Sequence, residues 1–213
     1  MNLRKGLPAE DRSNGYDMVA SEHIARREQR NIGVATVRRW ARSLPSGADV
    51  LDLGCGHGLP LSKALLNDGF VVYGVDASPS MVAAFHQHLP QGNVACEPVE
   101  DSRFFGRLFD GILAWGLLFL LAENAQRSLI HKVALALNQG GRLLFTSPAQ
   151  SCTWRDALTG LESRSLGAET YKALLLEADL VLVGEHTDEG DNDYYEAAKQ
   201  KCDDYCTTPG PAV

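Results

Sequence analysis

The sequence predicts an α/β protein with an open, doubly wound, mostly parallel sheet and helices on both of its faces. Three observations lead to this prediction. From Asp49 onward, short apolar runs alternate with amphipathic stretches of helical period. Five such strands are separated by helices, and right-handed crossovers then place the strands in one sheet. A glycine-rich loop follows the first strand, at the edge of the sheet where such folds bind ligands.

The segment ahead of the sheet, residues 1–48, is expected to fold as a helical lid. Apolar residues at helical spacing predict a helix from about Met18 to Arg42, with a break allowed at Gly33. Residues 1–45 contain nine Lys or Arg and five Asp or Glu, whereas the whole chain has a net charge of −7. Charged helix faces are usually solvated, so six arginines of this segment are expected to face water: Arg26, Arg27, Arg30, Arg38, Arg39 and Arg42.

Local patterns predict each element of the main domain, residues 49–200. Apolar runs predict strands, and apolar residues spaced four apart, as at Met81, Phe85 and Leu89, predict helices. Ser78 is expected to cap a helix whose first residue is Pro79, where a missing N–H costs nothing. The expected elements are, in order, strand 49–53, helix 59–68, strand 70–75, a helix that begins at 79, strands 93–96 and 109–114, helix 121–137, strand 142–146, helix 168–178, and strands 180–185 and 194–198.

Glycines and polar clusters are expected to separate these elements. Gly140 and Gly141 should stop the long helix before the fifth strand. The turn-rich stretch 188–192 should join the last two strands into a hairpin at one sheet edge. The polar segment 147–167 is long for a loop and is expected to be functional or partly helical. Residues 201–213 are expected to form a flexible tail.

Composition narrows the classes of function. A hydrophobic content of 45% supports a globular core, and the net charge of −7 argues against a general DNA or membrane-surface binder. The longest apolar run, 112–122, is too short to span a bilayer, and no signal peptide is expected. Five scattered cysteines indicate reduced thiols, a cytoplasmic protein and no metal site.

A glycine loop and an acidic residue after the next strand indicate a nucleoside ligand. The first strand runs into Asp52-Leu-Gly-Cys-Gly-His-Gly58, whose glycines let a ligand approach the backbone closely. Asp76, after the second strand, can accept both hydroxyls of a ribose. A dinucleotide site would have its third glycine at residue 59, which is Leu, so a ligand without pyrophosphate is favoured. A nicotinamide-linked dehydrogenase and a tight turn that binds nothing are the alternatives.

These motifs resemble those of the class I S-adenosylmethionine-dependent methyltransferases. Residues 50–58, Val-Leu-Asp-Leu-Gly-Cys-Gly-His-Gly, are similar to that family's first motif, and residues 73–78, Tyr-Gly-Val-Asp-Ala-Ser, to its second. Residues 109–115 and 137–145 resemble its fourth strand and its approach to the fifth. The resemblance covers residues 50–146, and the closing hairpin more loosely. It implies a Rossmann-like sheet of seven strands in which the last strand runs antiparallel to the rest.

The resemblance also implies how the cofactor, S-adenosylmethionine, is held. Asp76 would bind the ribose hydroxyls, the acidic segment 97–102 would lie beside the adenine, and the end of the fourth strand would contact the methionine part. The lid would fold over the cofactor. The residues expected to bind it are Tyr16, Asp52, Gly54, Cys55, Gly56, Asp76, Ala77, Ser78, Met81, Val99, Glu100, Ala114 and Trp115.

The predicted activity is methyl transfer to a small-molecule acceptor by in-line displacement. A sulfonium already activates its methyl group, so the protein must position the acceptor and exclude water, and only a protonated acceptor needs a base. No catalytic residue is assigned: His57 is a candidate base, with packing as its alternative role, and Trp115 is either a wall beside the methyl group or a core residue. A protein or RNA methyltransferase that docks through the basic N-terminal helix, and a non-catalytic module that binds the cofactor, stay open. The sequence indicates no oligomeric state.

Overall fold

The computed structural model describes residues 11–28 and 30–201, so the predicted tail lies outside the described residues except for its first residue. The α-helices are α1 (Ala20–Glu28), α2 (Val34–Ala41), α3 (Leu61–Asn67), α4 (Pro79–His88), α5 (Glu123–Ala136) and α6 (Ala168–Glu177), and two short 3-10 helices are η1 (Phe104–Gly106) and η2 (Leu118–Leu120). The strands are β1 (Asp49–Leu53), β2 (Val71–Asp76), β3 (Asn93–Cys96), β4 (Phe109–Ala114), β5 (Leu137–Thr146), β6 (Cys152–Arg155), β7 (Glu162–Ser165), β8 (Leu180–Thr187) and β9 (Asp193–Lys199).

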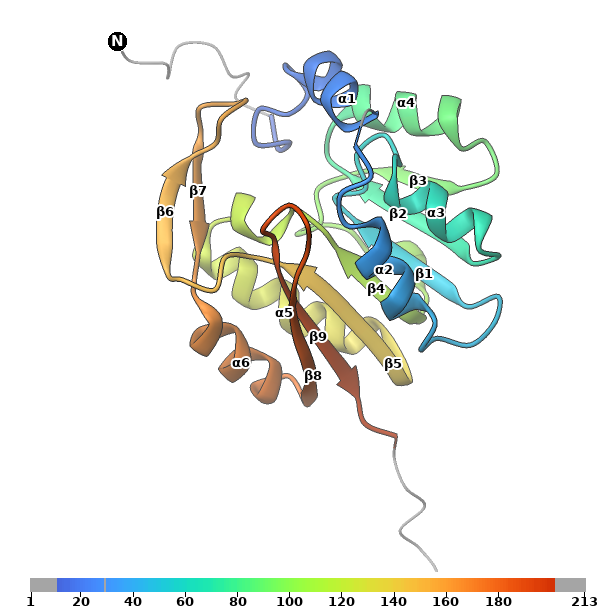
Figure 1. The fold of residues 1–213 in the computed structure, drawn as a ribbon, viewed down its shortest axis with the longest axis vertical. Helices are drawn as coiled ribbons and strands as arrows, with labels where there is room; N and C mark the ends of the chain where they lie inside the picture. The colour runs from blue at the N-terminus through green and yellow to red at the C-terminus, as the bar shows by residue number, and fades with distance from the viewer. Residues whose placement is uncertain (1–10, 29, 202–213) are drawn as a thin grey trace, which may run out of the picture.

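Seven strands form one sheet in the order β3-β2-β1-β4-β5-β9-β8 (Figure 1). The first five pair in parallel, and β9 runs antiparallel between β5 and β8. This topology confirms the predicted fold class, including the antiparallel last strand and the closing hairpin at the sheet edge. Strand order reverses at β1, which lies between β2 and β4, and parallel sheets bind ligands at the carboxyl ends of their strands at such a point.

One face of the sheet is covered by α2, α3 and α4. Val37 of α2 and Leu65 of α3 are fully buried in the same cluster as Val72 of β2. Gly74 lies on the same face of β2, and a Cβ there would come 3.3 Å from the ring of Phe85. The missing side chain therefore lets α4 approach the strand closely.

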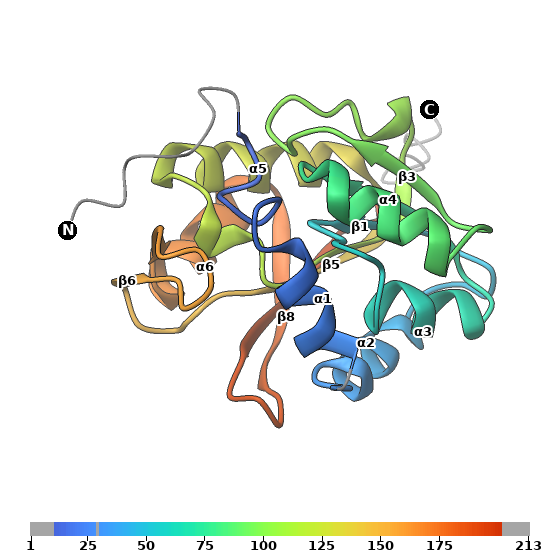
Figure 2. The same ribbon diagram turned by 90° about the horizontal axis from the view of Figure 1, so that it is seen from above.

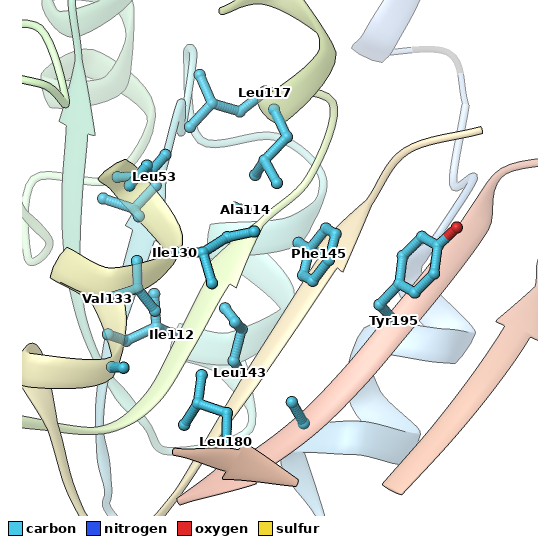
Figure 3. Close-up of a cluster of buried hydrophobic side chains, with 14 of the residues drawn as sticks. Leu53, Ile112, Ala114, Leu117, Ile130, Val133, Leu143, Phe145, Leu180 and Tyr195 are labelled. Carbon is cyan, nitrogen blue, oxygen red and sulfur yellow. The ribbon is translucent and has the colours of Figure 1, made fainter. Parts of the chain in front are cut away.

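The other face is covered by α5 and α6. Ile130 and Val133 of α5 belong to the same buried cluster as Leu143 and Phe145 of β5, and Figure 3 shows Val133 beside Ile112 of β4. The rings of Phe145 and Tyr195 stack with centroids 4.9 Å apart, so β5 and β9 are joined by aromatic packing as well as by their ladder. This core fixes the position of the carboxyl ends of β4 and β5.

The N-terminal segment forms two helices, α1 and α2, and Gly33, where the sequence allowed a break, has a φ of +86° at the start of α2. Two other sequence predictions about local structure need correction. Strand β5 begins at Leu137, five residues before the predicted start at 142. The chain is already extended at Leu137, which pairs with Phe109, and a register shift separates this pair from the rest of the ladder. Segment 147–167 contains a separate antiparallel pair, β6 and β7, rather than helix.

The packing of α2 on the sheet gives a first prediction. Trp40 is 2% exposed within the cluster of this face, whereas Arg39, next to it on α2, is exposed. Trp40→Ala should lower the free energy of unfolding by about 3–5 kcal/mol, because it removes a large buried side chain. Arg39→Ala should change it by less than about 0.5 kcal/mol. Denaturant titration of both variants measures the difference, and equal values would contradict this packing.

Candidate functional site

A cavity of about 190 Å³ lies at the carboxyl ends of β1, β2 and β4. Residues 11–28, which we call the strap, cross it between α4 and the β6–β7 hairpin (Figures 1 and 2). Its walls come from the strap, the glycine loop after β1, the end of β2, residues 98–100 and the segment after β4. The cavity therefore occupies the place where the sequence predicts a ligand.

Two glycines of the loop have different structural roles. Gly56 has a φ of +54°, and a Cβ there would have only Met81 Sδ nearby, at 3.9 Å, on the cavity side. Gly58 has a φ of +81°, and a Cβ there would come 2.5 Å from Leu89 and 2.8 Å from Phe85. Gly58 is thus required by packing against α4, whereas Gly56 leaves open space beside the backbone where a ligand can lie.

Asp76 connects the glycine loop to the start of α4. One of its carboxylate oxygens accepts the N–H of Gly56 at 2.8 Å, and the other accepts the N–H of Ser78 at 2.9 Å. Burial raises the pKa of Asp76, and these two hydrogen bonds act in the opposite direction. Each oxygen keeps a lone pair, so a ligand hydroxyl can still donate to this carboxylate.

Asp52 is a second buried carboxyl in the cavity wall. It accepts a hydrogen bond of 2.5 Å from Ser62 Oγ of α3. Burial raises its pKa to about 7, against the effect of that hydrogen bond. Together with Asp76, it makes this wall of the cavity suited to a cationic group.

Polar contacts attach the strap to both rims of the cavity. Asp17 accepts hydrogen bonds from Ser78 Oγ at 2.6 Å and from the N–H of Ser80 at 2.9 Å, so it caps α4 from outside that helix. On the other rim, the Tyr16 hydroxyl donates to Asp156, beside the β6–β7 hairpin, at 3.0 Å. The strap therefore holds α4 and the hairpin at a fixed separation.

Trp115 and Arg27 form the end of the cavity beyond β4. The indole N–H of Trp115 donates to the Tyr194 hydroxyl at 2.7 Å, which donates to Asp188 at 2.7 Å. The Arg27 guanidinium lies 4.1 Å from the ring centroid of Trp115. No ion pair joins Arg27 to a carboxylate among residues 11–28 and 30–201, so its charge is available to a ligand.

Most of the predicted site residues come together around this cavity. Those that line it are Tyr16, Asp52, Gly54, Cys55, Gly56, Asp76, Ala77, Met81, Val99, Glu100 and Trp115. Ser78 and Ala114 do not line it. The Ser78 hydroxyl accepts from Met81 N and donates to Asp17, and Ala114 is buried in the core between β4 and α5 (Figure 3).

The sequence interpretation missed the strap's contribution to the cavity. Arg27 is half-buried in the cavity wall rather than on a solvated face, and His23, one helical turn before it, lines the same cavity. The spacing of Ala20, His23 and Arg27 on one face of α1 was the available signal. Arg38 is also half-buried, in an ion pair with Asp68. Among the other lining residues not predicted are Arg12, Pro98, Leu117, Phe119, Leu120 and Leu121.

In the part of the chain that the structure describes, no three His, Cys, Asp or Glu side chains are arranged to hold a metal ion. No helix within those same residues has the length and apolar character needed to cross a membrane.

A model of the methyltransferase domain family matches residues 23–183, which include the glycine loop, Asp76 and the sheet. The chain belongs to this family. The family match and the fold confirm the resemblance to the S-adenosylmethionine-dependent methyltransferases that the sequence motifs predicted.

Relatives of known structure share this fold across nearly the whole chain. The 1,6-didemethyltoxoflavin-N1-methyltransferase of Burkholderia thailandensis, solved with S-adenosylhomocysteine, has a TM-score of 0.71 at 20% identity, with 94% of each chain covered. The magnesium protoporphyrin IX methyltransferase of Synechocystis, solved with S-adenosylmethionine, has a TM-score of 0.62 at 18% identity, with 92% and 86% covered.

A curated relative is the ubiquinone biosynthesis O-methyltransferase of Coxiella burnetii. It is 34% identical over 105 residues, which are 47% of this chain and 44% of the relative. The chain thus matches less than half the length of this relative.

The glycine loop gives a second prediction. Gly58→Ala should lower the free energy of unfolding by more than Gly56→Ala, since both strain a positive φ but only the first forces Leu89 and Phe85 to move. The strain alone costs on the order of 1 kcal/mol, and the overpacking adds about 1–3 kcal/mol. Denaturant titration without ligand compares the two variants. A Gly56→Ala variant that is the less stable of the two would contradict the packing described.

Proposed function

We propose that the cavity binds S-adenosylmethionine and that the protein transfers its methyl group to a small-molecule acceptor. The observation that carries this proposal is the pairing of Asp76 with an open space beside Gly56. A ribose can donate to Asp76 while the rest of the ligand lies along the loop backbone, where no side chain stands. Glu100 and Val99 line the same wall, and in this proposal they contact the adenine.

The charges in the cavity support this cofactor. S-adenosylmethionine carries a sulfonium, an ammonium and a carboxylate. Asp52 and Asp76 supply negative charge in the cavity wall, and Arg27 supplies positive charge at its far end. We assign the carboxylate of the cofactor to Arg27, because this half-buried guanidinium forms no ion pair within the described residues, with Asp52 and Asp188 acting on it only from farther away, and an anion would compensate its desolvation.

One end of the cavity, beneath the strap, is apolar. Phe119, Leu120 and Leu121 line it, and the Phe119 ring packs on Trp154 of β6 with centroids 5.4 Å apart. The strap and the hairpin meet over it through Tyr16 and Asp156. An apolar compartment beneath the strap suits a small acceptor that carries an apolar or aromatic ring.

The chain's own residues contribute positioning rather than proton transfer. The cofactor supplies an activated methyl group, and the apolar compartment holds the acceptor in line and excludes water. His23 and His57 are the two imidazoles in the wall, and burial lowers the pKa of each to about 4. Such weak bases remove a proton poorly at neutral pH, so we assign neither as a general base.

Calorimetry tests the cofactor assignment. S-adenosylhomocysteine should bind while NAD does not, and Gly56→Ala should weaken S-adenosylhomocysteine binding at least tenfold, since its Cβ occupies the space of the ligand. The protein is then incubated with S-adenosylmethionine and a panel of small phenols and amines. Release of S-adenosylhomocysteine would indicate an enzyme, and its absence a non-catalytic module. Binding of NAD, or an unchanged affinity in Gly56→Ala, would refute the assignment.

The role of Arg27 gives a further prediction. Arg27→Met should raise the dissociation constant for S-adenosylhomocysteine about 10- to 100-fold, which is the usual worth of a hydrogen bond to a charged group. Arg26→Met is the matched control, because Arg26 is exposed on the same helix and pairs with Glu22. Adenosine, which lacks the carboxylate, should bind both variants and the wild type alike. A loss of adenosine affinity in Arg27→Met would place Arg27 elsewhere in the site.

A further inference from the structure

Three histidines form a column that joins the strap to the body of the protein. His23 lies on α1, His57 in the glycine loop and His88 at the end of α4. The rings of His23 and His57 meet edge to face with centroids 6.2 Å apart, and those of His57 and His88 do so at 5.6 Å. We call these three residues the histidine column.

The middle ring is enclosed by its neighbours. His57 is 1% exposed, and its Nε2 has no hydrogen-bond partner among the described residues. Its carbonyl oxygen lies 3.3 Å from Nδ1 of His88. A proton added to His57 would thus create a buried cation with no acceptor, which a closed structure tolerates poorly.

The charged groups around the column make protonation more costly still. Arg27 faces both His23 and His57, and Arg26 also faces His23. Asp156 and the Tyr16 ring lie on the other side of His23, and Asp156 alone favours a proton there. These groups belong to the strap and the hairpin.

One further acid lies at the end of the column. Glu28 of α1 lies 3.5 Å from Nε2 of His88, which is at the opposite end of the column from His23. This carboxylate contacts His88, so it compensates no charge on His57 or His23. Burial lowers the pKa of His23 and of His57 to about 4, with Arg27 contributing to both.

We propose that the histidine column is a proton-sensitive latch, which holds the strap closed over the cavity at neutral pH and releases it in mild acid. Its three rings connect the strap to the glycine loop and to α4, the two elements that form the floor of the cavity. Release would remove Tyr16 and Arg27 from the cavity wall. Ligand affinity therefore depends on the charge of the column.

The sign of the effect follows from the lowered pKa values. An imidazole freed by opening regains a pKa near 6.5, so the open strap binds more protons than the closed one. Closure is fully favoured above about pH 6.5 and weakens as the pH falls toward 4. Between pH 7.5 and 5.5, each imidazole that titrates weakens closure about tenfold, and two together weaken it by up to ~100-fold.

Hydrogen exchange tests the latch without any ligand. After correction for intrinsic exchange rates, protection of the α1 amides should fall at least tenfold from pH 7.5 to pH 5.5, while protection of α5 amides stays unchanged. In the double variant His23→Phe/His57→Phe, which keeps two aromatic rings but removes the two imidazoles whose pKa is lowered, α1 protection should not change over this range. His86→Gln is the matched control, because His86 is exposed on α4 beside the column, and it should behave as the wild type.

Affinity for S-adenosylhomocysteine supplies the second measurement, which rests on the proposed function. It should fall in parallel with α1 protection in the wild type and much less in the double variant. Asp52, with a pKa of about 7, titrates in the same range but is unchanged in that variant. A pH dependence that persists in the double variant would assign the effect to Asp52 and overturn the latch.

The two proposals fail in different ways. Absence of S-adenosylhomocysteine binding at every pH would refute the cofactor assignment, and exchange would still report on the latch. Unchanged α1 protection at pH 5.5 would refute the latch alone. If the double phenylalanine variant does not fold, His23→Gln/His57→Gln replaces it with the same expected results, because glutamine also lacks a titrating group.

Discussion

The Asp76 carboxylate is the group on which the site depends, because two backbone amides from different elements converge on it. One amide, of Gly56, fixes the curve of the glycine loop, and the other, of Ser78, fixes the start of α4. Burial raises the pKa of Asp76, and the two backbone hydrogen bonds act in the opposite direction by favouring the charged form of the carboxylate. These two hydrogen bonds set the shape of the cavity floor, so a ribose would bind to a carboxylate that is already held in position.

The strap adds further hydrogen bonds at the start of α4. Asp17 adds a third acceptor at the start of α4, through Ser78 Oγ and Ser80 N, so the helix end is satisfied partly from outside the main domain. Arg27 on Trp115 anchors the other end of the strap. The cavity is therefore closed by polar contacts at separate points, and few apolar side chains of the strap are buried. Segments held in this way open more readily than those that bury a core.

The sheet and the glycine loop could be predicted because their signals are local. Strand runs, the Ser78 cap with Pro79 and the loop glycines each depend on a few neighbouring residues, and β3 and β4 have the predicted bounds. The role of Arg27 was missed: its spacing with Ala20 and His23 places the three on one face of α1, but spacing alone does not tell a solvated face from a cavity wall. The pairing of β6 with β7 was also missed. Burial alternates along both strands, but most of their side chains are polar, so hydrophobicity does not reveal the alternation. Ser78 was expected at the ligand, but its hydroxyl serves the helix end and the strap.

The place of β9 in the sheet has a consequence for how the protein is made. This strand is inserted between β5 and β8, and its Tyr194 holds Trp115 at the end of the cavity. During synthesis, β1 to β5 leave the ribosome well before β9, so the nascent sheet has an unpaired edge along β5 in the meantime. Such an edge is a site for wrong pairing. Trp115 of the cavity wall gains its Tyr194 partner only when β9, the last strand among the described residues, has paired with that edge.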